Sequence, residues 1–398
     1  MKVTTILKKT LTFVTPNMHT YRRNSLIAAV ASLTSGAAAT VTTIGRGIDC
    51  NAKEKHKIKR ADRLLSNANL SRESLGIYTE LAKHTVGTKQ RPIILVDWSD
   101  LDEYKRHFLL RASLPSHSRS ICVYEEVHSI KTKEKPATHT LFLKKLAQVL
   151  PQDCKPIIVT DAGFKTPWFR SVLAQGWDFV GRTRLPNFYS VDEESWQCIT
   201  HLYKKATGHA QAFIGYIARR APLKCQLVIY KQKPKGRKSL NRSGKPKQSK
   251  HAKVHIKSAR DPWLISSSLP YSRNSAAKLV KIYQLRMQIE EGFRDMKSRR
   301  FGQGFTYNKT TVQSRLSLLV LLTTLAHWFL MILGMAAKLE SKHRQYQANS
   351  LKTDNVLSLQ FIGQRVAADK GVKLYMRSCL NAIKQLQNVG TEYDYSNV

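Results

Sequence analysis

The sequence predicts an α/β protein with helical regions at both ends of the chain. Two aliphatic runs, Pro92–Asp97 and Pro156–Asp161, each begin with a proline, end in an aspartate and have the composition of buried strands. Between residues 92 and 184 the expected elements follow the order β-β-β-α-β-α-β. The 398 residues are 42% hydrophobic, so the chain can bury a sizeable core and wholesale disorder is excluded.

The chain is strongly basic. It contains 66 Lys and Arg against 27 Asp and Glu, a formal net charge of +39. Such an excess opposes compaction unless a polyanion neutralises it, which favours nucleic acid as a partner and an anionic membrane surface second. The six cysteines are far apart and form no C-x-x-C pair, so neither a zinc site nor a redox pair is indicated.

Residues 1–88 are predicted to be helical and basic. Arg22–Leu33 has the composition of a helix, the pair Ser35–Gly36 ends it, and Ala37–Gly45 can form a second helix. A third helix is expected over Ala52–Leu65. Short helices with a tight turn and a basic helix are compatible with a helix-turn-helix protein that reads DNA.

The third of these helices carries a basic stripe. Lys55, Lys59 and Arg63 are spaced by four residues, which places their side chains on one face. A stripe of this kind is often only a solvated face, and in a chain of this charge it fits contacts with DNA equally well. Both interpretations stay open at this point.

Five strands and two helices are expected between residues 92 and 184. The first strand ends at Asp97 and the fourth ends at Asp161. Pro167 suits the first turn of the second helix. The remaining strands are expected at His107–Leu114, Ser120–His128 and Trp177–Arg184, and the helices at Leu141–Leu150 and Thr166–Gln175.

The character of the sequence changes between residues 187 and 259, where β segments are expected. The run Lys231–Arg260 contains many Lys and Arg and no acidic residue, and Gly, Pro and Ser interrupt it. It is therefore predicted to be a flexible arm or a long hairpin loop that contacts nucleic acid. Strands are expected at Ser195–Tyr203, Gln211–Arg219, Gln226–Tyr230 and Pro262–Ser266, and a helix at Ser275–Ser298.

Asp97 and Asp161 are the first candidate functional residues. A carboxylate at the end of a buried strand is costly unless something binds its charge. If the two strands are neighbours, both carboxylates lie at one edge of the sheet, and a divalent cation relieves their repulsion. Oxygen ligands without a nearby Cys or His cluster favour Mg²⁺ or Mn²⁺. The alternative is that each aspartate only begins a turn or caps a helix.

The helix expected at Ser275–Ser298 carries a charged stripe beside an apolar one. At about 100° per residue, Glu290 lies on the charged stripe, whereas Glu291 points away toward solvent. The excess of cations suits a phosphate backbone, and ion pairing of Glu290 with its neighbours on the helix is the alternative. The charged stripe comprises Tyr283, Arg286, Glu290, Arg294 and Lys297.

One spacing in this helix identifies a resemblance. Tyr283-x2-Arg286-x3-Glu290-x6-Lys297 matches the Y-x2-R-x3-E-x6-K motif of bacterial insertion-sequence transposases, family four of the D-D-E class. The segments Ile94–Asp100 and Val159–Phe164 resemble the first and second acidic blocks of that family. Over about residues 20–360, the chain resembles the cut-and-paste transposases of composite tetracycline- and kanamycin-resistance transposons.

The resemblance implies a ribonuclease-H-like fold in which the first strand lies beside the fourth. It also implies that Asp97, Asp161 and Glu290 are catalytic and bind two Mg²⁺ ions, for which Mn²⁺ can substitute. One ion would activate water or a DNA 3′-hydroxyl, and the other would stabilise the leaving oxygen. No covalent enzyme intermediate is required.

The resemblance further assigns DNA contacts. Tyr283, Arg286, Arg294 and Lys297 would hold phosphates of the DNA strands. In the resembled enzymes the transposon ends are nicked, closed as hairpins, reopened and joined to target DNA. Trp263 would stack on a base flipped out during hairpin closure, and a core position for this Trp is an equal alternative.

The resemblance divides the chain into five regions and names its partners. We expect double-stranded DNA, both transposon inverted-repeat ends and target, a homodimer in the DNA complex, and a cytoplasmic, nucleoid-associated location in bacteria. The regions are a helical end-binding domain at 1–88, a ribonuclease-H-like core at 89–186 and 260–340, a β-rich basic insertion at 187–259, and a helical region at 341–398 that assists dimerisation.

Other functions remain open at the sequence level. A ribonuclease-H-like nuclease without strand transfer and a non-enzymatic, basic DNA-packaging protein both fit the composition. Leu316–Ala337 is long and apolar enough to span a membrane. A buried core helix is the favoured interpretation of this segment, so no membrane is expected as a partner.

Overall fold

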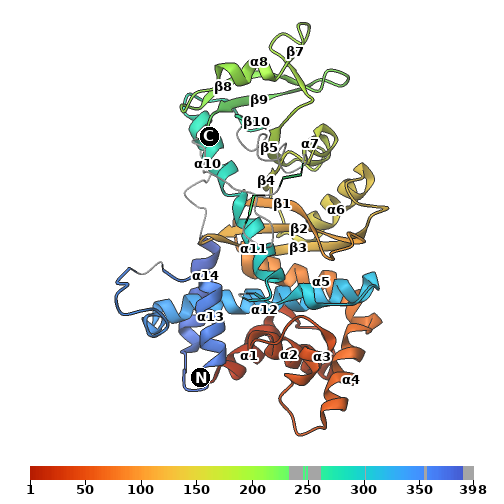
Figure 1. Cartoon of the computed structure of the whole chain (residues 1–398), viewed down its shortest axis with the longest axis vertical. Coiled ribbons are helices and arrows are strands. Elements are labelled where there is room, and N and C mark those ends of the chain that lie inside the picture. The colour runs from red at the N-terminus through yellow and green to blue at the C-terminus, as the bar shows by residue number, and fades with distance from the viewer. Residues whose placement is uncertain (233–244, 247, 250–260, 301, 354–355, 389–398) are drawn as a thin grey trace. The chain divides into compact units, whose positions relative to one another are not determined.

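Figure 1 shows the computed structural model of the chain. It describes residues 1–232, 245–246, 248–249, 261–300, 302–353 and 356–388, so most of the predicted basic arm at Lys231–Arg260 lies outside the described residues. The described chain forms two compact units. Unit 1 contains Met1–Pro156 and the described residues from Met287 onward, and unit 2 contains the described part of Ile157–Arg286. The five-region division stays a prediction.

The N-terminal part of unit 1 is helical, as predicted for residues 1–88. The break after the second helix falls at Gly36, whose φ of +104° suits glycine. The helix predicted at Ala37–Gly45 begins only at Val41, because the Thr40 side chain caps it by accepting a hydrogen bond from the Thr43 N–H at 3.2 Å. The helices are α1 (Val3–Val14), α2 (Thr20–Thr34), α3 (Val41–Arg46), α4 (Glu54–Leu65) and α5 (Ala68–Val86).

Helices α3 and α4 pack closely. A Cβ atom at Gly45 on α3 would lie 2.5 Å from the Ile58 Cα on α4, which is too close for any side chain, so only glycine fits at this crossing. Leu64 and Leu65 of α4 are buried, and its Lys and Arg side chains lie on the other sides. The two helices are short and the second of them, α4, is the basic helix that the sequence predicted at Ala52–Leu65.

A three-stranded antiparallel sheet follows the N-terminal helices in unit 1. Its order is β3-β2-β1, and its register places Asp97 opposite Arg111 and Arg111 opposite Glu125. The prediction that the first strand ends at Asp97 is wrong, because backbone pairing with the second strand continues to Asp100. The elements are β1 (Ile93–Asp100), β2 (His107–Ser116), β3 (Arg119–Ser129) and the helix α6 (Pro136–Val149).

The remaining part of unit 1 is helical and contains its core. The segment Leu316–Ala337 is almost entirely buried within one long helix. This is the one helix, among the described residues, that is long and apolar enough to cross a membrane, and 89% of its most apolar window is buried inside the protein. The elements are α11 (Met287–Lys297), η1 (Phe305–Tyr307), α12 (Gln313–Leu339), η2 (Lys342–Tyr346), α13 (Leu359–Ala368) and α14 (Met376–Asn388).

Unit 2 has a mixed sheet of order β4-β5-β10-β9-β8-β6-β7, in which only β4 and β5 are parallel. The prediction of a strand at Ser195–Tyr203 is wrong. Only Gln197 and Cys198 pair as a strand, and a short helix follows. So short a window does not distinguish the helical period of 3.6 residues from the strand period of 2. The elements are β4 (Ile157–Thr160), α7 (Thr166–Leu173), β5 (Asp178–Thr183), β6 (Phe188–Ser190), β7 (Gln197–Cys198), α8 (Thr200–Lys205), β8 (Gln211–Ile217), β9 (Leu223–Tyr230), β10 (Trp263–Ser267) and α10 (Ser275–Gln284).

The single helix predicted at Ser275–Ser298 is wrong. The Leu285 N–H bonds to the Ile282 carbonyl at 3.1 Å, and the Arg286 N–H bonds to the Tyr283 carbonyl at 3.2 Å. These i→i−3 bonds tighten the turn and separate α10 from α11, at the point where unit 2 passes into unit 1. The charged stripe is therefore divided between two helices.

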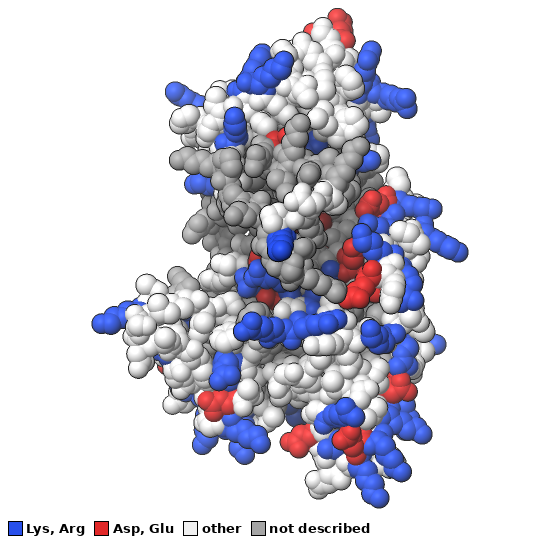
Figure 2. All heavy atoms as spheres, viewed as in Figure 1, with Lys and Arg blue, Asp and Glu red and all other residues white. Residues whose placement is uncertain are grey.

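Basic side chains outnumber acidic ones on the face of the molecule shown in Figure 2. Figure 2 shows far more Lys and Arg than Asp and Glu on the face in view, with a group of them at the lower right, where Figure 1 places α4. A few acidic side chains lie among them. The face in view agrees with the positive net charge of the sequence.

The crossing of α12 and α13 yields a test of the core. A Cβ atom at Gly334 would lie 1.9 Å from the Leu359 carbonyl oxygen, so Gly334→Ala must displace α13. We expect a loss of about 1–3 kcal/mol in the free energy of unfolding, measured with urea.

Gly76→Ala is the matched control for this substitution. Gly76 lies on α5 with open space around the added Cβ, so alanine is expected to stabilise the protein by roughly 0.5–1 kcal/mol. Equal stability of Gly334→Ala and the wild-type chain would contradict the packing of α12 on α13.

Candidate active site

Asp97 is partly buried within β1. Its Oδ1 accepts a hydrogen bond from the Trp98 N–H at 2.8 Å. Side chains alternate between the two faces of a strand, so Asp97 and Ser99 share one face and Trp98 lies on the other. The cross-strand register adds Arg111 to the face of Asp97.

A buried ion pair continues this row across the sheet. The Arg111 Nε donates to Glu125 Oε2 at 2.7 Å, and both side chains are almost fully buried. Glu125 also accepts from the Tyr78 hydroxyl at 3.0 Å and from the Thr324 hydroxyl. Burial lowers the pKa of Arg111, but the nearby Glu125 carboxylate outweighs this and raises the pKa, so the guanidinium stays charged.

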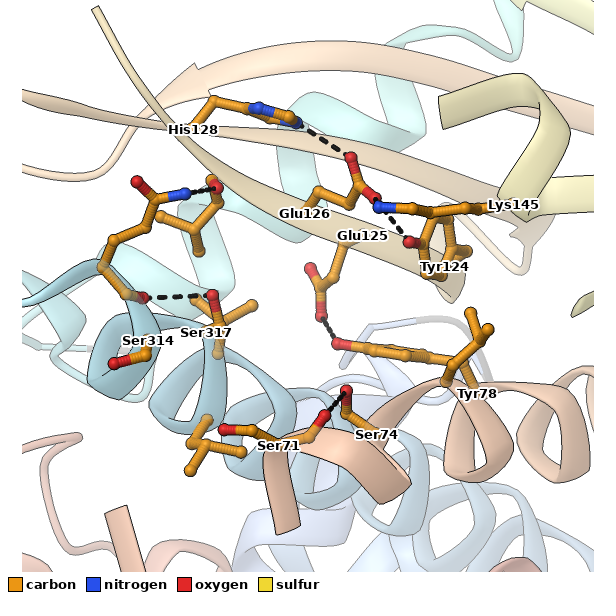
Figure 3. Close-up of a pocket in the computed structure, with 15 residues that line it drawn as sticks. Ser71, Ser74, Tyr78, Tyr124, Glu125, Glu126, His128, Lys145, Ser314 and Ser317 are labelled. Carbon is orange, nitrogen blue, oxygen red and sulfur yellow. Dashed lines mark hydrogen bonds and ion pairs between the residues drawn. The ribbon is translucent and has the colours of Figure 1, made fainter. Parts of the chain in front are cut away.

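Figure 3 shows the pocket beside this pair, a cavity of about 370 Å³ between α5, β3, α6 and α12. Glu125 points toward Tyr78, and Glu126 points the opposite way, toward His128 and Lys145. Burial raises the pKa of Glu126, but hydrogen bonds from His128, Lys145 and the Tyr124 hydroxyl outweigh it and lower the pKa to about 2. The pocket is therefore lined by charges that are already paired.

Trp98 is held on the opposite face of β1 by histidines. Its indole Nε1–H donates to His139 Nε2 at 3.1 Å, and its ring lies edge-on to His128 at 5.3 Å between centroids. Burial lowers the pKa of His139 to about 4, so the imidazole is neutral at pH 7 and can accept this bond. The residue next to Asp97 is thereby anchored to α6.

Glu290 lies exposed on α11, which packs on the sheet of unit 1. Lys297, two turns further on the same side of the helix, donates to Ser99 Oγ at 2.8 Å. Burial lowers the pKa of Lys297, while Asp100 and Asp97 act in the opposite direction. The charged side of α11 therefore faces the part of β1 that carries Asp97 and Ser99.

The prediction that Glu291 and its side of the helix face solvent is wrong. Asp295 is buried and accepts from the Arg119 Nε at 2.5 Å, and Gln288 accepts from the Ser116 N–H at 2.8 Å. Glu291 pairs with Arg119 at 3.8 Å and also with Arg294. This side packs on β2 and β3, because arginine at the edge of the sheet supplies the charge that a buried acid requires.

Asp161 follows β4 in unit 2, as predicted. Its Oδ1 accepts from the Gly163 N–H at 2.8 Å, so it also begins a turn. Tyr283, near this carboxylate, is buried, and burial raises the pKa of its hydroxyl despite the nearby Arg286 and Arg182. The Arg286 guanidinium lies 5.9 Å from the centre of the Tyr283 ring.

Trp263 is partly buried in an aromatic and cationic cluster. Its ring packs edge-on against Tyr283 at 5.0 Å and against Tyr230 at 5.9 Å between centroids. Arg182 lies 5.9 Å from the Trp263 ring and donates to the carbonyls of Asp261 and Pro262. The cluster supports a core role for Trp263 and also brings cations beside its ring.

The three predicted acids belong to different units. Asp97 and Glu290 lie in unit 1, and Asp161 lies in unit 2. Among the described residues, no group of three His, Cys, Asp or Glu side chains stands close enough to hold a metal ion. Their meeting at one metal site stays a prediction. The chemistry of the set, three carboxylates, fits Mg²⁺ or Mn²⁺.

The predicted basic stripe is accessible. Lys55, Lys59 and Arg63 are all exposed on α4. Lys59 and Arg63 also line a groove toward the start of α2, whereas Lys55 lies outside it.

Comparison with known proteins places the chain in a family. The family model described as Transposase DDE domain matches residues 88–326, which is more than half of the chain. The chain belongs to the DDE transposase family. Transposases of this family act in DNA transposition and normally use divalent metal ions, and the matched range contains Asp97, Asp161 and Glu290.

Two further comparisons add little to the family assignment. The chain is similar to the cryo-EM structure of the piggyBac transposase synaptic complex with hairpin DNA, with 10% sequence identity, a TM-score of 0.41, and coverage of 95% of this chain and 77% of that one. A TM-score this low does not establish a shared fold. No curated protein matches the chain.

Two features of this transposase were missed at the sequence level. Glu125 and Arg111 form a buried ion pair, and Arg182 lies buried beside Trp263. An arginine or a glutamate within an apolar strand indicates a buried charge that requires a partner. The sequence does not identify that partner, because it depends on the register of the strands.

The low pKa of His139 yields a pH prediction. Between pH 6.5 and about 4 the unfolded chain binds a proton at this residue that the folded chain does not, so stability falls as the pH falls through this window. His139→Gln retains an acceptor for the Trp98 indole and removes this titration. We expect its loss of unfolding free energy from pH 7 to pH 5 to be smaller than that of the wild type by about 2 kcal/mol.

Urea unfolding at the two pH values measures this difference. His209→Gln, at an exposed histidine in unit 2, is the control and should keep the pH dependence of the wild type. The same pH dependence in His139→Gln and the wild type would show that His139 is not held neutral.

Proposed function

We propose that the chain is a cut-and-paste DNA transposase that cleaves the ends of an insertion sequence and joins them to target DNA. The observation that carries the proposal is the family match over residues 88–326, which spans all three predicted acids. The placement of these acids supports it: Asp97 lies on β1, Asp161 directly follows β4, and Glu290 lies on the side of α11 that leads to Lys297 and β1.

Asp97, Asp161 and Glu290 would hold two Mg²⁺ ions, for which Mn²⁺ would substitute. Their donor set consists of carboxylate oxygens, the ligands that Mg²⁺ prefers. Bound ions of this kind supply Lewis-acid activation of the attacking oxygen and stabilisation of the leaving oxygen in an in-line displacement at phosphorus. The positive charge of the chain attracts the DNA substrate.

The cations and the tyrosine of the motif would bind DNA phosphates. Burial raises the pKa of Tyr283, so its hydroxyl stays protonated and can donate to a phosphate oxygen. Arg286 and the exposed Arg294 provide guanidinium forks for phosphate oxygens. Lys297 would keep α11 against β1 through Ser99 and add positive charge beside Asp97.

Other parts of the chain would recognise and pair the DNA ends. Lys55, Lys59 and Arg63 on α4 would contact end-sequence DNA, and Trp263 would stack on a flipped base during hairpin closure. The region 341–398 would assist formation of a homodimer on DNA. The enzyme would act in the bacterial cytoplasm on nucleoid DNA, without a membrane partner.

The two adjacent glutamates give the sharpest test of the metal site. Glu290→Gln should lower Mg²⁺-dependent cleavage by about a thousandfold, since metal stabilisation is worth several kcal/mol and each 1.36 kcal/mol is tenfold in rate. The substrate is DNA that carries the inverted repeats flanking the coding region. Glu291→Gln, whose carboxylate pairs with Arg119 and Arg294 instead, should cleave at close to the wild-type rate.

Retained cleavage by Glu290→Gln would refute the metal assignment. A supercoiled target plasmid in the same reaction separates two enzyme classes. A transposase forms strand-transfer products with the plasmid, whereas a nuclease without strand transfer releases only cut ends.

Trp263 yields a separate prediction about hairpins. Trp263→Ala should reduce hairpin products by roughly 10–100-fold, because stacking of a base on an aromatic ring is worth about 1–3 kcal/mol. First-strand nicking should persist, and Trp263→Phe should keep much of the hairpin product. If Trp263→Ala lost nicking and hairpins equally, and Trp263→Phe also lost both products, Trp263 would be assigned to the core alone.

A further inference from the structure

The turn between β2 and β3 holds one side of α11, within unit 1. The Ser116 N–H at the end of β2 donates to Gln288 Oε1 at 2.8 Å, and the Arg119 Nε at the start of β3 donates to Asp295 Oδ2 at 2.5 Å. Gly292 lies between these two contacts and packs on β3. Gln288, Gly292 and Asp295 are four and three residues apart, so they share one side of the helix, and that side is fixed to the turn.

Arg119 is the cation of this contact. Its Nη1 atom lies 3.8 Å from Glu291 Oε2 and donates to the Ser118 carbonyl at 3.1 Å. The side chains of Arg119 and Asp295 are only 14% and 11% exposed, so water and salt screen their attraction little. Burial raises the pKa of the Asp295 carboxyl and Arg119 opposes this rise, so the charge of Asp295 depends on Arg119.

A second contact holds the other side of α11. Lys297 donates to Ser99 Oγ on β1 at 2.8 Å, and Ser99 follows Asp97 by two residues on the same face of the strand. Two residues separate Asp295 from Lys297, which is about 200° around a helix. The contacts with Arg119 and with Ser99 therefore lie on nearly opposite sides of α11, and together they determine its rotation about its own axis.

The rotation of α11 decides which of two adjacent glutamates faces β1. Glu290 precedes Lys297 by seven residues, about two helical turns, and lies on its side of the helix. Glu291 precedes Asp295 by four residues and lies on the side of Arg119. A rotation of about 100° would bring Glu291 to the position of Glu290, and the bond between Arg119 and Asp295 opposes it.

We propose that Arg119 is a positioning residue for the metal site. It fixes the rotation of α11 that turns Glu290, and not the adjacent Glu291, toward the part of β1 that carries Asp97. Replacing a side chain that orients a metal ligand typically lowers metal affinity by about 10–100-fold. The inference rests on the proposed function, because it concerns the metal site that Glu290 would complete.

Exchange of the buried pair for apolar side chains separates positioning from stability. Arg119→Leu/Asp295→Leu leaves neither charge of the pair buried alone, and such exchanges commonly preserve a fold. The Mg²⁺ concentration that gives half-maximal cleavage of inverted-repeat DNA should rise by about 10–100-fold. Calorimetry of Mg²⁺ binding to the full chain, bound to a duplex that ends at the cleaved end of the repeat, should show the same loss of affinity without any reaction. A purely structural residue would lower the amount of active protein and leave both values unchanged.

Two single variants that keep Asp295 test the positioning role even if the double variant does not fold. Arg119→Lys retains a cation for the carboxylate and should keep most of the Mg²⁺ affinity, whereas Arg119→Gln offers only a neutral amide and should bind Mg²⁺ more weakly. Because Mg²⁺ demands near-ideal octahedral geometry, its binding should suffer more than that of Mn²⁺. Equal Mg²⁺ affinity in Arg119→Lys and Arg119→Gln would contradict the role of the ion pair.

An ion pair elsewhere in unit 1 provides the matched control. Arg22 on α2 pairs with Glu73 on α5, and both side chains are partly buried. Arg22→Leu/Glu73→Leu removes the same two charges without touching α11 and should bind Mg²⁺ like the wild type. Thermal unfolding followed by circular dichroism checks that each variant folds. An equal loss of Mg²⁺ affinity in the two double variants would overturn the positioning role.

The positioning role and the proposed function fail in different ways. Mg²⁺ binding that is the same in Glu290→Gln and in the wild type would refute the metal site itself. Mg²⁺ binding that requires Glu290, with the same affinity in folded Arg119→Leu/Asp295→Leu as in the wild type, would refute the positioning role alone.

Discussion

Unit 1 is organised around one buried carboxylate, that of Glu125. It binds Arg111 on β2, Tyr78 on α5 and Thr324 on α12, so a single side chain joins the sheet to the N-terminal helices and to the core helix. Removing one partner of such a pair leaves an uncompensated buried charge, which typically costs about 3–5 kcal/mol. Arg111 lies opposite Asp97 in the register of β1 and β2, so the buried pair lies beside the strand that carries the first predicted metal ligand.

Local patterns were enough to predict much of this transposase. The order β-β-β-α-β-α-β and the position of Asp161 after its strand follow from short apolar runs, whose period is visible without tertiary information. The end of β1 was misplaced because pairing with β2 carries the strand past Asp97. Apolar spacing did not reveal the break at Leu285, where local i→i−3 bonds replace the α-helical ones. It could not reveal the burial of Asp295 either, since that depends on Arg119, which is distant in the sequence.

The charge of the chain and the predicted chemistry complement each other. Carboxylates that lie close together repel one another, and so do clustered Lys and Arg side chains. Each cluster is therefore stable only when a ligand of opposite charge binds to it. Metal ions would supply the partner for Asp97, Asp161 and Glu290, and DNA would supply it for the cations of α4 and of the motif. Within unit 1 the chain pairs its other buried acids itself, as Asp295 with Arg119 illustrates.

Anomalous scattering from Mn²⁺ in crystals of the protein–DNA complex tests the central assignment most directly. The account predicts manganese peaks coordinated by carboxylate oxygens of Asp97, Asp161 and Glu290 together, beside a DNA phosphate. Manganese bound at a site that lacks any one of these three carboxylates would contradict it.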